Sequence, residues 1–181
     1  MNILPYNLGG GWNRMDQYYS PHYYSYRSNN TAKKTAREDC FIKLNDCGPE
    51  PFVINIDAAS KFNKTYRTAI WTGNYLQLTL MSINPGEDIG LEIHPNNDQF
   101  IRIEEGRGVV KMGDRRDDLY FQENVYDDYA FIIPAGKWHN LINTGDRPLK
   151  LYSIYAPPQH RPGTIHETRE IAQAAEEEHG H

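Results

Sequence analysis

The chain has 181 residues and a net charge of -5, which suits one domain with a sizeable core and excludes the basic stripe of a nucleic-acid-binding protein. No apolar run reaches 18 residues and no secretory signal opens the sequence, so we expect a cytoplasmic protein with no membrane span and no nucleic-acid partner. Cys40 and Cys47 show no metal-finger pattern and fit reduced thiols, although their C-x6-C spacing leaves a disulfide open.

Residues 1–37 form a polar, tyrosine-rich N-terminal arm. Its tyrosines lie among Gly, Asn and Ser, and the run Gly9-Gly10-Gly11 disfavours regular structure. We expect the arm to pack a few aromatic side chains onto the domain or onto a neighbouring subunit. A surface-adhesion or coat-like role is the weaker alternative.

Residues 38–156 are typical of an all-β domain, because short apolar stretches alternate with turn residues. The pattern predicts a helical turn at 57–63, capped by Asp57, and a hairpin tip at Asp114–Asp118. It predicts strands at 52–56, 66–71, 76–83, 99–103, 108–112, 130–133, 139–143 and 149–155. Antiparallel strands at this spacing fit a double-sheet jelly-roll barrel.

Residues 157–181 contain a proline-rich segment and a helix. The segment Pro157–Gly163 does not suit a helix or the interior of a sheet. Thr164-x-x-Glu167 matches a capping box and predicts a helix that runs to about Glu178. The proline-rich segment could bring His160 and His166 over the barrel mouth, but an ordinary surface loop is the favoured interpretation.

Four polar side chains in two separate segments form a candidate metal site: Glu92, His94, Gln99 and His139. Residues i and i+2 of a strand share a face, so the first two can reach one point. The turn at Pro95–Asp98 can then return Gln99, and the tight turn Pro134-x-Gly136 can deliver His139 from a distant strand. Two imidazoles, one carboxylate and one amide oxygen suit one divalent Zn, Mn, Fe, Co or Ni ion.

The spacing of these residues resembles the two motifs of the cupin superfamily. The first motif has Gly86, Glu92, His94, Gln99 and Gly106 in register, and the second has Asp128, Pro134, Gly136, His139 and Asn143. Every interval fits, but Glu92 replaces the usual His, Gln99 the usual Glu and Asp128 the usual Gly. The usual cupin site carries its one negative charge at the fourth ligand, where this chain has the neutral Gln99. Here Glu92 would carry that charge, and because the total charge of the site is unchanged, we expect it still to bind metal. The resemblance implies the cupin double-stranded β-helix.

Several stretches within residues 50–170 are similar to small bacterial single-domain cupins that are often labelled mannose-6-phosphate isomerase: 67–73, 91–95, 100–106, 138–145 and 152–158. That label implies metal-dependent isomerisation of a sugar or sugar phosphate through an enediol. One alternative is an Fe(II)-dependent dioxygenase that uses His94, His139 and Glu92. Another is a non-catalytic, metal-dependent binder of a small sugar or organic acid.

The catalytic base and the assembly are less well defined. Glu105, His160 and His166 are candidate bases, and Lys137, the cation nearest to His139 in sequence, is interpreted as a turn residue. No Arg or Lys cluster beside the ligands suggests a phosphate clamp. We expect a homodimer, since a jelly roll leaves sheet edges that need cover and the arm supplies aromatic side chains suited to an interface.

Overall fold

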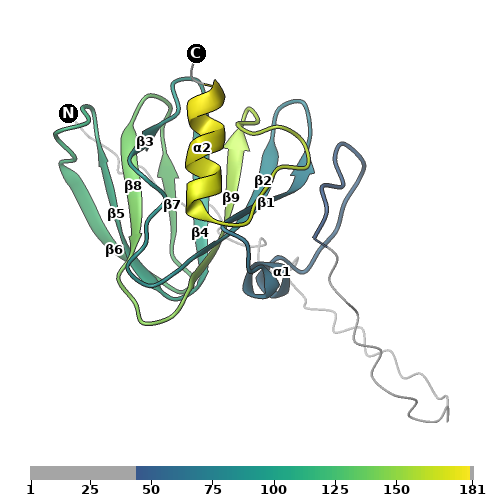
Figure 1. Cartoon of the computed structure of the whole chain (residues 1–181), viewed down its shortest axis with the longest axis horizontal. Coiled ribbons are helices and arrows are strands. Elements are labelled where there is room, and N and C mark those ends of the chain that lie inside the picture. Colours follow the sequence, from purple (N-terminus) through teal and green to yellow (C-terminus); the bar gives the residue numbers. More distant parts are fainter. Residues whose placement is uncertain (1–43, 180–181) are drawn as a thin grey trace, which may run out of the picture. The chain divides into compact units, whose positions relative to one another are not determined.

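The computed structural model of the chain describes residues 44–179, which form two antiparallel sheets (Figure 1). The six-stranded sheet contains, in spatial order, β10 (Ile165–His166), β1 (Arg67–Thr72), β2 (Gln77–Ile83), β9 (Leu149–Ala156), β4 (Asp98–Glu105) and β7 (Ala130–Ile133). The four-stranded sheet contains β3 (Glu92–Ile93), β8 (Trp138–Asn143), β5 (Arg107–Gly113) and β6 (Phe121–Tyr126). The all-β jelly-roll fold is therefore confirmed. The N-terminal arm at 1–37 and Cys40 lie outside the described residues, and Cys47 is exposed.

The main core is formed by inward-facing residues of both sheets. Because successive strand residues alternate between the two faces, every second side chain contributes to it. Its largest fully buried members come from β2, β4, β7, β8 and β9, and they are Met81, Ile83, Ile101, Ile103, Ile133, Leu141, Leu149 and Leu151. Among the described residues, no helix is long and apolar enough to cross a membrane.

A second core covers the outer face of the six-stranded sheet. Helix α1 (Ile56–Phe62) and the segment before it place Ala59, Phe52 and Ile54 against Leu78 and Leu80 of β2. Strand β2 is thus buried on both faces, and its inward face carries the polar side chains of Gln77 and Thr79.

Two expectations for the segment before β1 are wrong. Residues 52–55 belong to no strand, and Phe52 and Ile54 pack on the outer face of the six-stranded sheet. Helix α1 begins one residue earlier than expected, and its cap is Asn55, whose side chain accepts a hydrogen bond from the Ala58 amide. Asp57 instead lies in the first turn, where it pairs with Lys61.

The capping-box expectation is also wrong. Helix α2 (Arg169–His179) begins after Thr168, whose carbonyl accepts from the Ala172 amide at 3.2 Å. Thr164 instead closes a turn with the carbonyl of Arg161, and the next two residues pair with β1 as strand β10. A long-range strand partner therefore outweighs the local capping pattern.

Strand β10 is too short for a recognisable alternation, and β6 is an exposed edge strand with one buried side chain, so neither was expected. The strand expected at Glu92 and His94 is the short β3, which ends at Ile93. The hairpin tip is confirmed, since Arg115 and Asp118 form a bridge in the exposed loop between β5 and β6.

Asp128 occupies the position where the second motif usually has glycine. Its φ is 69°, in the left-handed region that favours glycine and that Asp tolerates better than most residues. Its carboxylate also accepts a hydrogen bond from Arg102 Nη2 at 2.6 Å. This departure from the motif therefore preserves the local backbone conformation.

Candidate metal centre

The pairing of β3 with β8 places two of the candidate ligands directly opposite each other. Glu92 is the cross-strand partner of His139, so both side chains lie on the same face of the ladder. His94 follows β3, and its carbonyl accepts a hydrogen bond from the Gly136 amide at 2.9 Å. The Pro134–Gly136 turn, where Gly136 has a φ of +79°, thus ties the second motif to the first.

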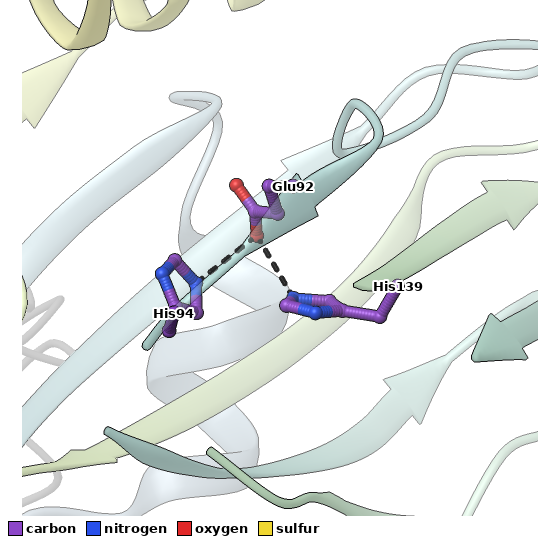
Figure 2. A group of neighbouring side chains, drawn as sticks. All are labelled: Glu92, His94 and His139. Atoms are coloured by element: carbon purple, nitrogen blue, oxygen red, sulfur yellow. Dashed lines mark ion pairs between the residues drawn. The ribbon is translucent and has the colours of Figure 1, made fainter. Parts of the chain in front are cut away.

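Three ligand atoms converge at this corner of the barrel. Figure 2 shows the Glu92 carboxylate directed between two imidazoles, with Oε1 3.4 Å from His94 Nε2 and 3.3 Å from His139 Nε2. All three donor atoms lie within 4.8 Å of one another. Ligands placed about 2.1 Å from a tetrahedral ion are separated by about 3.4 Å, so the observed spacing suits a transition metal.

The donor atoms are buried without hydrogen-bond partners in the described part of the chain. They include Glu92 Oε1, His94 Nε2, His139 Nε2 and Gln99 Oε1. Buried polar atoms are almost always paired, so a group of unpaired acceptors fits the binding of a cation. His139 Nδ1 lies 2.9 Å from the Lys137 carbonyl, which fixes Nδ1 as the protonated nitrogen and leaves the Nε2 lone pair for a metal.

The side-chain amide oxygen of Gln99 has no hydrogen-bond partner within the described residues. Its side chain is 1% exposed, and its Nε2 donates to Ser153 Oγ at 2.9 Å, which leaves Oε1 unpaired within the described residues. Its cross-strand neighbour Tyr155 packs edge-on against the ring of His94, with 5.6 Å between ring centroids. Gln99 therefore suits the fourth ligand position, which stays a proposal.

Comparisons with known proteins agree with this geometry. The Cupin domain family matches residues 79–155. The Bacillus subtilis (strain 168) protein "Uncharacterized protein YrkC" is 63% identical to this chain over 144 residues. That match covers 80% of this chain and 77% of the relative. This chain belongs to the cupin superfamily. The mimivirus protein "Uncharacterized protein L612", from Acanthamoeba polyphaga mimivirus, is 43% identical over 115 residues, 63% of this cupin and 70% of the viral protein.

Solved structures show the same fold. The match to the crystal structure of BH2720 from Bacillus halodurans spans 72% of this cupin and 99% of the BH2720 chain, with 66% identity and a TM-score of 0.72. The match to TT1209 from Thermus thermophilus spans 58% of this cupin and 96% of the TT1209 chain, with 20% identity and a TM-score of 0.50. At this identity the likeness shows the fold alone. None of these four names states an activity, so the mannose-6-phosphate isomerase label stays a proposal.

Burial and a nearby charge act on the carboxylate of this cupin's site. Burial raises the pKa of Glu92, and the charge of Arg67 lowers it. Arg67 lies in β1, is 1% exposed and was not singled out from the sequence. The sequence feature that could have indicated Arg67 was a charged residue at the start of a strand otherwise made of Thr, Ala, Ile and Trp.

A cavity of about 520 Å³ adjoins the candidate ligands. Its walls come from β3, the proline-rich segment, β10 and helix α2, and include Glu92, His94, His160, Arg161, Thr164, His166 and Glu176. The favoured interpretation of the proline-rich segment as an ordinary surface loop is therefore wrong. The segment is held over the site because Asn97 Nδ2 donates to the Pro157 carbonyl at 2.6 Å and the side chain of Gln77 binds the backbone of His160.

Gln77 fixes His160 through both of its amide atoms. Gln77 Nε2 donates to the His160 carbonyl and Gln77 Oε1 accepts from the His160 amide, each at 2.9 Å. The His160 ring packs edge-on against Tyr155 at 5.1 Å, and its Nε2 is buried without a partner in the described residues. Burial and the charge of Arg67 lower the pKa of His160 to about 2, so the imidazole is neutral at neutral pH.

The other residues singled out from the sequence have different environments. His166 lines the cavity with its ring 6.4 Å from that of His160. Glu105 accepts from Arg147 at 3.4 Å and is not among the cavity-lining residues of the described structure. Lys137 contacts Asp114 and the Tyr120 hydroxyl, at 3.2 Å for the latter, which agrees with its interpretation as a turn residue.

Proposed function

We propose that this cupin is a metal-dependent aldose–ketose isomerase that acts on a small sugar or sugar derivative, with His160 as the base. The observation that supports the proposal most directly is the position of His160, whose buried Nε2 has no partner within the described residues and lies in the same cavity as Glu92 and His94. Enolisation needs a base within reach of the substrate.

Glu92, His94, His139 and Gln99 would hold the ion in this proposal. A bound divalent ion would polarise the C1 carbonyl and C2 hydroxyl oxygens of the sugar. His160 Nε2 takes the proton from C2, the hydroxyl proton of O2 passes to O1, and the proton on His160 returns to C1. The atoms balance without an oxidant or reductant, because aldose and ketose are isomers.

The walls of the cavity suit a polyhydroxylated substrate. Thr164 and Arg161 can hydrogen-bond to sugar hydroxyls, and the proline-rich segment together with helix α2 limits the access of water to the enediol. The firm attachment of His160 by Gln77 would hold the base at a constant distance from C2.

Deuterium incorporation at C2 tests the proposal. Metal-loaded protein would be incubated in deuterated water with mannose 6-phosphate, fructose 6-phosphate, D-glucuronate and a panel of free pentoses and hexoses. We expect deuterium at C2 of at least one sugar and a fall of about 10²–10⁴-fold in His160→Gln, with metal content unchanged. Absence of exchange in every sugar would reject the isomerase, and loss in His166→Gln with retention in His160→Gln would move the base to His166.

An Fe(II)-dependent dioxygenase is the second candidate, because Glu92, His94 and His139 form a two-His-one-carboxylate set. Oxygen consumption by Fe(II)-loaded protein in the presence of small organic acids and sugars, without deuterium exchange, would favour it. Ligand binding with neither oxygen uptake nor exchange would favour the non-catalytic binder.

We also propose that the chain is a homodimer. The end strands β6 and β7 and the residues next to them carry exposed large hydrophobic side chains that suit burial against a second copy: Tyr120, Phe121, Tyr126, Tyr129 and Ile132. Light scattering should give twice the chain mass of 21.0 kDa. A monomer at micromolar concentration would reject the dimer, and a dimer that persists after deletion of residues 1–37 would exclude the arm from its interface.

A further inference from the structure

Two buried donors beside the site have no role in the proposed isomerisation. Arg67 is 1% exposed, and its Nε has no hydrogen-bond partner in the described part of the chain. The hydroxyl of Tyr155 is equally buried and unpaired there, and its ring packs against both His94 and His160. Unpaired N–H and O–H groups in a buried position require acceptor atoms. These two residues therefore point to an oxygen-rich ligand group next to the metal centre.

Arg67 has a partner that can be exchanged. Its Nη1 donates to Glu176 Oε1 at 2.9 Å, and Glu176 lies on helix α2 in the wall of the cavity. The Arg67 side chain is 1% exposed and that of Glu176 is 45% exposed. Glu176 can therefore rotate into water at little cost, whereas the buried guanidinium needs another anion whenever Glu176 leaves.

The guanidinium is held firmly in β1. The backbone of Arg67 pairs with Met81 of β2 and with His166 of β10, and its guanidinium carbon lies 5.5 Å from the centre of the Tyr66 ring. A fixed planar guanidinium is suited to two parallel hydrogen bonds with a carboxylate. The buried Arg67 guanidinium is thus fixed, whereas its carboxylate partner Glu176 can move into solvent.

We propose that Arg67 anchors a carboxylate of the ligand and that Glu176 occupies this place in the ligand-free protein. The inference rests on the proposed function, since it identifies the substrate of that site as a sugar acid. A carboxylate is favoured over a phosphate because the group now bound to Arg67 is a carboxylate with a single charge. A phosphate monoester carries a charge of about -1.5 to -2 and would need a second cation beside Arg67, for which Arg161 in the cavity wall is the candidate.

A matched pair of ligands tests this anchor. D-glucuronate and D-glucose differ only at C6, which is a carboxylate in one and a hydroxymethyl group in the other. Titration calorimetry with the zinc-loaded protein should give at least about tenfold tighter binding of D-glucuronate. Glu176→Gln removes the competing carboxylate and should increase this preference further, whereas Arg67→Met should abolish it.

Glu170→Gln is the matched control, because Glu170 is exposed on the same helix and is not among the residues that line the described cavity. It should leave both affinities unchanged. Glu176→Gln keeps the test decisive if Arg67→Met fails to fold, since its side chain is isosteric and half-exposed. Equal affinities for both sugars, with no change in Glu176→Gln, would overturn the proposal.

Two further results separate this inference from the isomerase. Tighter binding of D-glucose 6-phosphate than of D-glucuronate would overturn the carboxylate assignment. Binding of D-glucuronate that depends on Arg67, without deuterium exchange, would support the anchor and reject the isomerase. Exchange into neutral aldoses with no preference for D-glucuronate would support the isomerase and overturn the anchor.

Discussion

Glu92 and His139 face each other across a strand pair, whereas His160 reaches the cavity beside Glu92 from a segment without regular secondary structure. The metal corner, formed by Glu92, His94 and His139, is positioned by the register between β3 and β8. The cover, residues 157–176, is positioned by the pairing of β10 with β1 and by hydrogen bonds from side chains far away in the chain. Metal binding should therefore tolerate damage to the cover, while any chemistry that depends on His160 should not.

The largest expected effect is the loss of the metal when the corner loses two ligands. Replacement of even an outer-shell partner typically costs 10–100-fold in metal affinity, so His94→Ala combined with His139→Ala should weaken zinc binding by more than about 100-fold. Titration calorimetry and metal analysis of the purified protein provide the measurement. His166→Ala, which changes the cover only, should retain the metal, and stoichiometric metal in the double variant would refute the site.

The next effect concerns the displaced charge. Glu92→Gln should weaken metal binding much more than Gln99→Ala, because the first change removes the single anion and the second removes a neutral amide that water can replace. We expect a difference of about tenfold or more in the dissociation constant for zinc. Equal losses, or a greater loss for Gln99→Ala, would show that the charge does not lie at Glu92.

Damage to the cover should leave the corner intact. Gln77→Ala removes both hydrogen bonds to the backbone of His160 and should lower the free energy of unfolding by about 1–3 kcal/mol. Deuterium exchange at C2 should fall with it, while zinc affinity stays within a factor of about two to three of the wild type. Urea titration and calorimetry make the comparison, with the exposed Gln122 on β6 replaced by Ala as a control. A loss of metal in Gln77→Ala would show that corner and cover are coupled.

The smallest effect is the pH dependence of the cover's attachment. Burial raises the pKa of Asp46, but hydrogen bonds from Thr72, Gly163 and Gly48 outweigh it and hold the pKa below its ordinary value. The contribution of this carboxylate to stability is thus present above the ordinary Asp pKa and is lost as the pH falls through the lower folded-state value.

Asp46→Asn should therefore destabilise the protein at pH 7 by about 1 kcal/mol and have less effect near pH 2. Urea unfolding at the two pH values measures the difference. An equal destabilisation at both values would assign the effect to packing and not to the charge.

Local patterns and distant contacts explain which parts of the structure were predictable. The i, i+2 relation of Glu92 and His94 and the turn that delivers His139 are short-range features, so their meeting point could be anticipated. The alternation at 52–56 correctly indicated burial but not strand pairing, because a side chain packed on a completed sheet gives the same pattern as one in a ladder. The capping box at Thr164 failed for a related reason, since β10 pairs with β1.

Strand alternation and turn residues act over a few positions, so they were enough to predict the all-β jelly roll and the three side chains that meet at the metal corner. The cavity could not be predicted in this way, because it depends on contacts between distant parts of the chain. Gln77 lies 83 residues from His160 and Arg67 lies 109 residues from Glu176, so no local pattern relates the members of either pair. The positions of His160, of the buried Arg67 guanidinium and of the cavity wall depend on contacts that exist only after the sheets and helix α2 have packed together.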